Sequence, residues 1–144
     1  MNADELTADL ILDEGIRLKP YTDTAGKLTI GVGRNLTDDG ISADEARALL
    51  GNDIADAWAD LQREYPWVVS RPESVQRGLC NMAVNMGVGG LAMFKQMLAC
   101  CQAGDYNGMA DAALNSTWAT QVGSRAFRIA ALFRNPTDSG SVGV

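Results

Sequence analysis

The chain has 144 residues, of which 47% are hydrophobic and 21% are charged, a composition typical of a globular protein. Its net charge of -6 argues against general nucleic-acid binding, because that binding depends on cationic side chains that neutralise phosphates. The absence of histidine excludes Ser-His-Asp and Cys-His catalysis and nearly all catalytic zinc sites. Acid–base chemistry near neutral pH must therefore come from carboxylates, lysine, tyrosine or cysteine.

The sequence predicts neither a membrane-spanning segment nor a signal peptide nor a set of disulfides. No run reaches the roughly 18 consecutive apolar residues of a transmembrane helix, so we expect no membrane insertion. The acidic start, Met1–Glu5, lacks the basic and apolar regions of a signal peptide, so we expect synthesis in a cytoplasm without an export signal. We expect Cys80, Cys100 and Cys101 to be reduced and mostly buried.

The first third of the sequence predicts a helix followed by a small sheet. Apolar residues recur at helical spacing from Asp4 to Asp13, and Gly15 is a natural helix end. Between Arg17 and Leu36 the pattern changes. A turn around Gly26 leads into Lys27–Gly33, which has the pattern of a short strand.

A long helix is predicted next. Ser42 and Glu45 have the spacing of a capping box, with the serine at the N-cap and the glutamate three residues later. One helical face then continues for about five turns and ends before Pro66. The apolar residues on that face are Ala46, Leu49, Leu50, Ile54, Ala57, Trp58 and Leu61. Such a helix is suited to connecting a small N-terminal lobe to the rest of the chain.

The remainder predicts helices separated by glycine and proline. The expected segments run from Glu73 to near Gly87, from Leu91 to Cys101 with a stop at Gly104, from Tyr106 to Leu114, and from Arg125 to Phe133. We expect the polar tail from Thr137 to Val144 to be loose. The predicted fold class is therefore α+β, mainly helical, with one small sheet near the N-terminus.

Three polar residues of the first third form a candidate catalytic set. Glu14 follows Asp13 at the C-terminal end of a helix, where the macrodipole disfavours carboxylates, and such local violations concentrate at functional sites. Asp23 lies in the next turn and Thr29 on the returning strand. Taken singly, they are better explained as solvated acids, a turn cap and a strand former. Two carboxyl groups that face one groove are the catalytic groups that glycoside hydrolysis requires.

Several ordered motifs resemble the bacteriophage lysozymes of the T-even type. The resemblance covers nearly the whole chain except the tail. It is carried by Asp13–Tyr21, Asp23–Gly33, Ile41–Ala46, Asn81–Gly87, Trp118, Ser124–Arg128 and Phe133-Arg134. It implies a lysozyme-like two-lobe fold within a single domain, 1–144. The expected parts are a small β lobe at about 14–40, a connecting helix at about 43–63, a helical lobe at about 70–134 and a loose tail at 135–144.

The resemblance implies a muramidase that hydrolyses the beta-1,4 bond between N-acetylmuramic acid and N-acetylglucosamine in peptidoglycan. Glu14 would be the general acid, Asp23 would activate or position the water, and Thr29 would hold that water on the opposite face of the sugar. The family implies inversion of configuration. Arg125 would orient Glu14, and Arg128 would pair with Asp13. A merely basic face on the last helix remains the alternative for both arginines.

The sequence also departs from the best-known family pattern. Arg34 stands where a histidine is expected, and we predict that it pairs with Asp53. Val84 and Asn85 replace an aromatic residue and a glutamine of the cleft. Together with Asn35 at the cleft rim, they are the candidate substrate-binding residues.

The expected setting is that of an endolysin. Such an enzyme is made in the host cytoplasm and reaches the wall after a separate holin permeabilises the membrane. We expect a monomer that requires no cofactor and no metal. The alternatives are a lytic transglycosylase, which cuts the same bond without water, and a non-catalytic peptidoglycan-binding module on the same fold. A virion protein or a delivered toxin would also be able to carry this domain.

Overall fold

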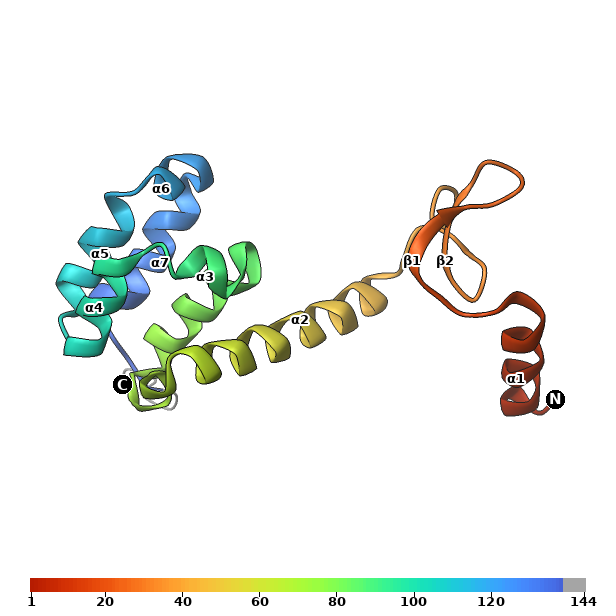
Figure 1. Cartoon of the computed structure of the whole chain (residues 1–144), viewed down its shortest axis with the longest axis horizontal. Coiled ribbons are helices and arrows are strands. Elements are labelled where there is room, and N and C mark those ends of the chain that lie inside the picture. Colours follow the sequence, from red (N-terminus) through yellow and green to blue (C-terminus); the bar gives the residue numbers. More distant parts are fainter. Residues whose placement is uncertain (139–144) are drawn as a thin grey trace. The chain divides into compact units, whose positions relative to one another are not determined.

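A computed structural model of the chain describes residues 1–138 (Figure 1). Its elements are α1 (Ala3–Glu14), β1 (Arg17–Thr22), β2 (Leu28–Gly31), β3 (Arg34–Asn35), α2 (Ala43–Glu64), the 3-10 helix η1 (Pro66–Ser70), α3 (Glu73–Leu91), α4 (Lys95–Ala103), α5 (Tyr106–Leu114), α6 (Thr117–Val122) and α7 (Ser124–Arg134). This confirms a mainly helical α+β fold. None of the helices in residues 1–138 is both long enough and apolar enough to cross a membrane.

The contacts divide the chain into two compact units, and the boundary between them falls inside α2. The first unit is Met1–Leu49, and the second begins at Leu50.

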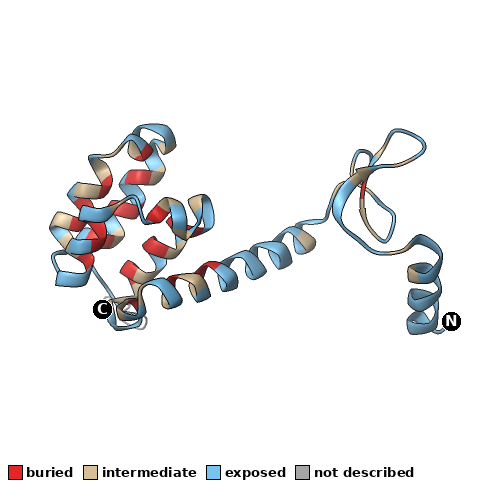
Figure 2. Ribbon diagram, viewed as in Figure 1, coloured by how far each residue is buried: buried red, intermediate tan, exposed pale blue. Residues whose placement is uncertain are grey.

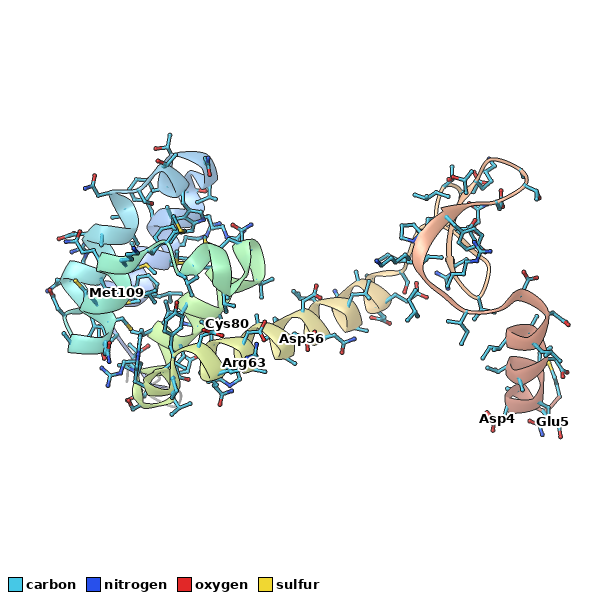
Figure 3. The ribbon with its side chains drawn as sticks, in the orientation of Figure 1. Asp4, Glu5, Asp56, Arg63, Cys80 and Met109 are labelled. Carbon is cyan, nitrogen blue, oxygen red and sulfur yellow. The ribbon has the colours of Figure 1, made fainter. Side chains whose placement is uncertain are left out.

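The first unit opens with α1, whose ends are both set by local hydrogen bonds. The side chain of Asn2 caps the helix, because its Oδ1 accepts from the backbone N–H groups of Asp4 at 3.1 Å and Glu5 at 3.2 Å. These two acids lie in the first turn (Figure 3). The helix ends where Gly15 takes a φ of 73° and its N–H donates to the carbonyl of Ile11. The predicted first helix is thereby confirmed.

The three strands form an antiparallel sheet in the order β1-β2-β3, as the change of periodicity predicted. Tyr21 pairs with Thr29 across the first hairpin, and Ile30 pairs with Arg34 across the second. The middle strand is shorter than the predicted Lys27–Gly33. It ends at Gly31 because positive φ angles at Gly31 and Gly33 turn the chain back into β3.

The predicted capping box opens α2. The N–H of Ser42 donates to Oε2 of Glu45 at 2.7 Å, and the N–H of Glu45 donates to the Ser42 hydroxyl at 3.1 Å. The same carboxylate receives both terminal nitrogens of Arg34, at 2.9 and 2.7 Å. The partner of Arg34 within its own unit is therefore Glu45, and Asp53, the predicted partner, belongs to the other unit. The capping box explains this choice, because it turns the Glu45 carboxylate back toward the chain that precedes the helix.

We expect the Glu45 contacts to make the protein sensitive to acid. Arg34, followed by the Ser42 N–H, lowers the pKa of Glu45 from 4.5 to about 2. Because the folded-state pKa is the lower one, the stabilisation is present above pH 4.5 and is lost as the pH falls to about 2. Glu45→Gln is therefore expected to lower the melting temperature near neutral pH, and this difference from the wild type should vanish near pH 2.

Thermal melts followed by circular dichroism across this pH range check the expectation. Asp44→Asn is the matched control, since this carboxylate is also in the first turn of α2 but is almost fully exposed and, among residues 1–138, pairs only with the neighbouring Arg47, at 3.3 Å. Its effect on the melting temperature should be small. A Glu45→Gln difference that stays constant from pH 6 to about 2 would contradict the assignment.

The second unit holds the hydrophobic core, in which α7 packs against α5 and α3 (Figure 2). The largest fully buried side chains are Phe133, Leu61, Leu79, Met82, Leu91, Met97, Met109 and Ile129. On the helix after Pro72, the apolar residues Val75, Leu79, Met82 and Ala83 are buried. On α2 the result differs from the predicted face: Ala57 and Leu61 are buried, but Leu50 and Ile54 remain exposed.

Glycines shape the helices of the second unit. The predicted stop near Gly87 is present as a break with a φ of 73°, after which the chain regains helical turns up to Leu91. The next helix begins at Lys95 rather than at the predicted Leu91. It closes at Gly104, which is left-handed, as the sequence predicted. Helix α6 was not predicted.

The start of the tail is held, contrary to the expectation of a loose segment. Ser74 is 1% exposed, and its hydroxyl donates to the carbonyl of Leu132 at 2.9 Å and accepts from the N–H of Thr137 at 2.9 Å. The N–H of Ser74 in turn donates to the Thr137 carbonyl at 2.9 Å. The rest of the predicted loose tail, 139–144, lies outside the described residues.

The three cysteines carry free thiols, as expected. Cys101 is buried, and desolvation raises its pKa to about 12. Burial also raises the pKa of Cys80, which is half-buried. Both shifts disfavour the reactive thiolate, so these residues serve as small apolar side chains.

Candidate active site

Glu14 is the last residue of α1, and its side chain extends toward the turn between β2 and β3. A methyl group built on Gly33 would lie 3.5 Å from Oε2 of Glu14, so the carboxylate faces the side of Gly33 on which a side chain would stand. The residue is exposed, and in residues 1–138 its side chain has no hydrogen-bond partner. The carboxyl group is therefore available to an external ligand.

Asp23 is fixed by the backbone of the hairpin between β1 and β2. Its Oδ1 accepts from the N–H groups of Ala25 at 2.9 Å and Lys27 at 2.8 Å. Such a turn is what an aspartate at this position favours. Its Oδ2 has no partner within the described part of the chain. One carboxylate oxygen is thus held in place while the other remains free to accept a proton or a water.

Thr29 lies on β2 and is 3% exposed. Its hydroxyl donates to the carbonyl of Lys27 at 3.0 Å, and the same carbonyl accepts from the backbone N–H of Asp23 at 2.9 Å. The structure therefore brings Asp23 and Thr29 together on one backbone anchor. Because the threonine uses its proton in this bond, its oxygen lone pairs remain able to accept from a water.

The candidate substrate residue of this unit, Asn35, is engaged in a turn. Its amide nitrogen donates to Oδ2 of Asp38 at 2.9 Å, and its amide oxygen accepts from the Asp38 N–H at 2.9 Å. Lys27 contacts the other oxygen of Asp38 at 3.1 Å. This amide therefore shapes the loop after β3.

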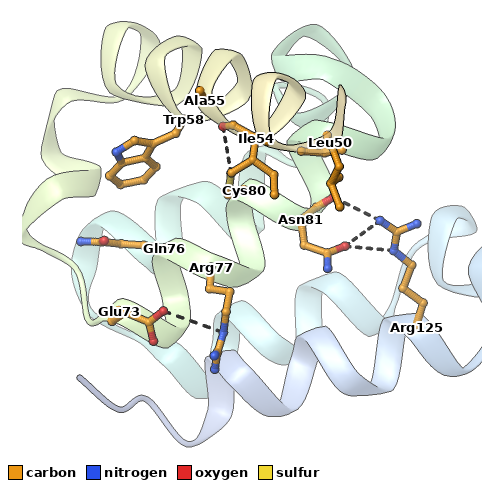
Figure 4. A pocket seen from close by; sticks show the side chains of 12 residues that line it. Leu50, Ile54, Ala55, Trp58, Glu73, Gln76, Arg77, Cys80, Asn81 and Arg125 are labelled. Atoms are coloured by element: carbon orange, nitrogen blue, oxygen red, sulfur yellow. Dashed lines mark hydrogen bonds and ion pairs between the residues drawn. The ribbon is translucent and has the colours of Figure 1, made fainter. Parts of the chain in front are cut away.

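The second unit contains a groove of about 580 Å³ between α2 and α3 (Figure 4). Its walls are largely apolar, and Val84, another candidate substrate residue, lines it. At one end Arg125 is held by Asn81, whose Oδ1 accepts from Nε at 3.0 Å and from Nη2 at 2.6 Å. The Asn81 carbonyl accepts from Nη2 at 3.2 Å as well. Asn85, the third candidate, is exposed on α3.

Three expected ion pairs join residues of different units and stay predictions. They are Glu14 with Arg125, Asp13 with Arg128, and Arg34 with Asp53. Within the described part of its own unit, Arg128 contacts no acid and instead donates to the Ser124 hydroxyl at 3.1 Å.

Sequence reasoning missed two residues of these sites, Gly33 and Asn81. The Gly31-Val32-Gly33 spacing indicated a tight turn, but nothing in it showed which side chain would approach the second glycine. Asn81 belongs to a motif of the resemblance, yet its link to Arg125 spans 44 positions of sequence. Its amide is visible as a partner only once the helices are packed.

The comparisons with known proteins agree with one another. The profile described as phage lysozyme matches residues 12–134. The pre-baseplate central spike protein Gp5 of Enterobacteria phage T4 is 35% identical over 145 residues, which cover 81% of this chain and 25% of the spike protein. The probable T4-type lysozyme 2 of Dictyostelium discoideum is 25% identical over 154 residues, covering 87% of this chain and 91% of that protein. The chain thus spans a quarter of the first relative and nearly all of the second.

Proposed function

The chain belongs to the phage lysozyme family, and from this premise we propose that it is a muramidase that hydrolyses the beta-1,4 bond between N-acetylmuramic acid and N-acetylglucosamine. The family match and the relative named as a T4-type lysozyme support a lysozyme-like hydrolase of peptidoglycan. The observation that carries the proposal is one compact unit containing an available carboxyl group, Glu14, together with Asp23 and Thr29 on a shared anchor.

In the proposed reaction Glu14 protonates the leaving glycosidic oxygen. Without histidine, a carboxyl group is the natural proton donor at the working pH of a wall hydrolase. The free Oδ2 of Asp23 takes a proton from the attacking water, and Thr29 accepts a hydrogen bond from the same water. Attack from the opposite face of the sugar inverts the anomeric centre, the outcome for two carboxyl groups that leave space for a water.

Arg125 is proposed to orient Glu14. The hydrogen bonds that Nε and Nη2 of Arg125 donate to Asn81 support this role. They limit the rotamers of the long arginine side chain before it meets Glu14. The pairs Asp13 with Arg128 and Arg34 with Asp53, and the substrate contacts of Asn35, Val84 and Asn85, belong to the same proposal.

Two biological settings are compatible with this reaction. We propose an endolysin that lyses the host after a holin has opened the membrane. The second candidate is a wall-penetrating part of a phage particle, which the relative named as a central spike protein favours. Both settings use the same bond cleavage, so the chemistry is tested first.

Mass spectrometry of the fragments released from purified peptidoglycan tests the reaction. Digestion in ¹⁸O-labelled water is expected to give reducing muramic acid ends that carry one heavy oxygen. Proton NMR of the first products is expected to show the α anomer, as inversion of a β bond requires.

Other products would overturn the proposal in defined ways. Anhydro-muramic ends without label would identify a lytic transglycosylase and leave Asp23 and Thr29 without a function. Binding to cell walls without any released fragment would identify a non-catalytic module. An early β anomer would retain the hydrolase but reject inversion.

A further inference from the structure

Two glycines flank the turn between β2 and β3, and they share one backbone conformation. Gly31 has a φ of 70° and Gly33 a φ of 74°, so a side chain at either position would strain the backbone. They differ in their surroundings. A Cβ on Gly31 would meet nothing within 4 Å, whereas a Cβ on Gly33 would lie 3.5 Å from Oε2, 3.7 Å from Cδ and 3.9 Å from Cγ of Glu14.

The contact at Gly33 involves the oxygen that has to reach the substrate. A proton donor acts only when the accepting oxygen comes within roughly 2.6–3.2 Å of it. A methyl group 3.5 Å from Oε2 would occupy part of the shell from which a glycosidic oxygen approaches. It would not collide with the carboxylate itself, because this distance is an ordinary van der Waals contact.

We infer that Gly33 is a positioning residue, which keeps one side of the Glu14 carboxyl group open to the glycosidic oxygen; this rests on the proposed function. The turn alone explains glycine at both positions. Access to the acid gives the absence of a side chain at Gly33 a second consequence, which Gly31 does not share.

The test compares Gly33→Ala with Gly31→Ala. Both variants add one methyl group at a positive φ, so both are expected to lower the melting temperature by a similar amount. Steady-state kinetics on solubilised peptidoglycan strands should separate them. Gly33→Ala is expected to have a kcat about tenfold or more below that of Gly31→Ala, with KM within about twofold, because only the proton-transfer geometry is disturbed.

Equal kcat values for the two variants would overturn the inference while leaving an active wild type and the proposed function intact. An inactive wild type, or a Glu14→Gln variant with full activity, would overturn the proposed function and the inference with it. If either alanine variant fails to fold, Gly33→Asn and Gly31→Asn replace the pair. Asparagine tolerates a positive φ better and still adds a Cβ, so the same difference in kcat is expected.

Discussion

Replacing Glu14 by glutamine is expected to lower the rate of wall lysis by about 10²–10⁴-fold, the usual contribution of a general acid. The amide preserves the shape of the side chain, but its N–H groups are far too weakly acidic to transfer a proton to the leaving oxygen. Stability should stay the same or rise. Glu14 and Asp13 both lie in the last turn of α1, where the helix dipole disfavours negative charge.

Turbidity of cell-wall suspensions measures the activity, and calorimetry measures the melting temperature. Glu5→Gln is the matched control, because Glu5 lies at the other end of the same helix, where a carboxylate is favoured. This control should retain activity and lose a little stability. Near-wild-type lysis by Glu14→Gln would remove Glu14 from the catalytic role.

Phe133→Ala is expected to lower the free energy of unfolding by about 3–5 kcal/mol. Phe133 is 0% exposed on α7, and its ring lies against Gly78 of α3 so closely that a Cβ there would be 2.4 Å from Cε1. Removing the ring leaves a cavity between two helices that pack together in the core. Urea denaturation gives the difference directly.

Two further variants sharpen this test. Phe127→Ala is the control on the same helix, and its effect should stay within about 0.5 kcal/mol because Phe127 is 69% exposed. Gly78→Ala is expected to destabilise by overpacking, and Phe133→Leu should recover part of that loss when the two are combined. Strictly additive effects in the double variant would show that the ring and the glycine do not share one packing site.

The elements that were predicted most accurately from the sequence have capping residues or stop glycines at their ends. The capping box of Ser42 and Glu45 and the glycine stop at Gly104 are local signals, and both are present as predicted. Helix α5 has the predicted bounds because Gly104 and Asp105 precede it, and Asp105 caps its first turn. Local hydrogen bonding decides these boundaries, so a short window of sequence is sufficient.

The features that escaped prediction depend on partners distant in sequence or on short elements. Helix α6 has six residues, too few for a periodic pattern. Helical spacing showed that Leu50 and Ile54 share a face, but it does not state what covers that face. The contact of Arg34 with Glu45 was not predicted, because it depends on the capping box turning the Glu45 carboxylate back toward the chain before the helix.

The residues of the candidate site also fall into those that the sequence could identify and those that it could not. Glu14, Asp23 and Thr29 carry functional groups, and their spacing matched a known family, so the sequence was enough to name them. Gly33 has no functional group, and its contact with Glu14 appears only when the end of α1 meets the turn after β2.

The buried Ser74 bears on where this domain is to be trimmed for expression. The family match ends at residue 134, which suggests Arg134 as a terminus. A chain shortened to that point would lose Thr137, the acceptor for the Ser74 N–H and a donor to its hydroxyl. It would also lose Asp138, whose Oδ1 accepts from the N–H of Glu73 at 3.2 Å. The N–H groups of Glu73 and Ser74 in the first turn of α3 would then lose these acceptors, so we expect the shortest well-folded version to extend through residue 138.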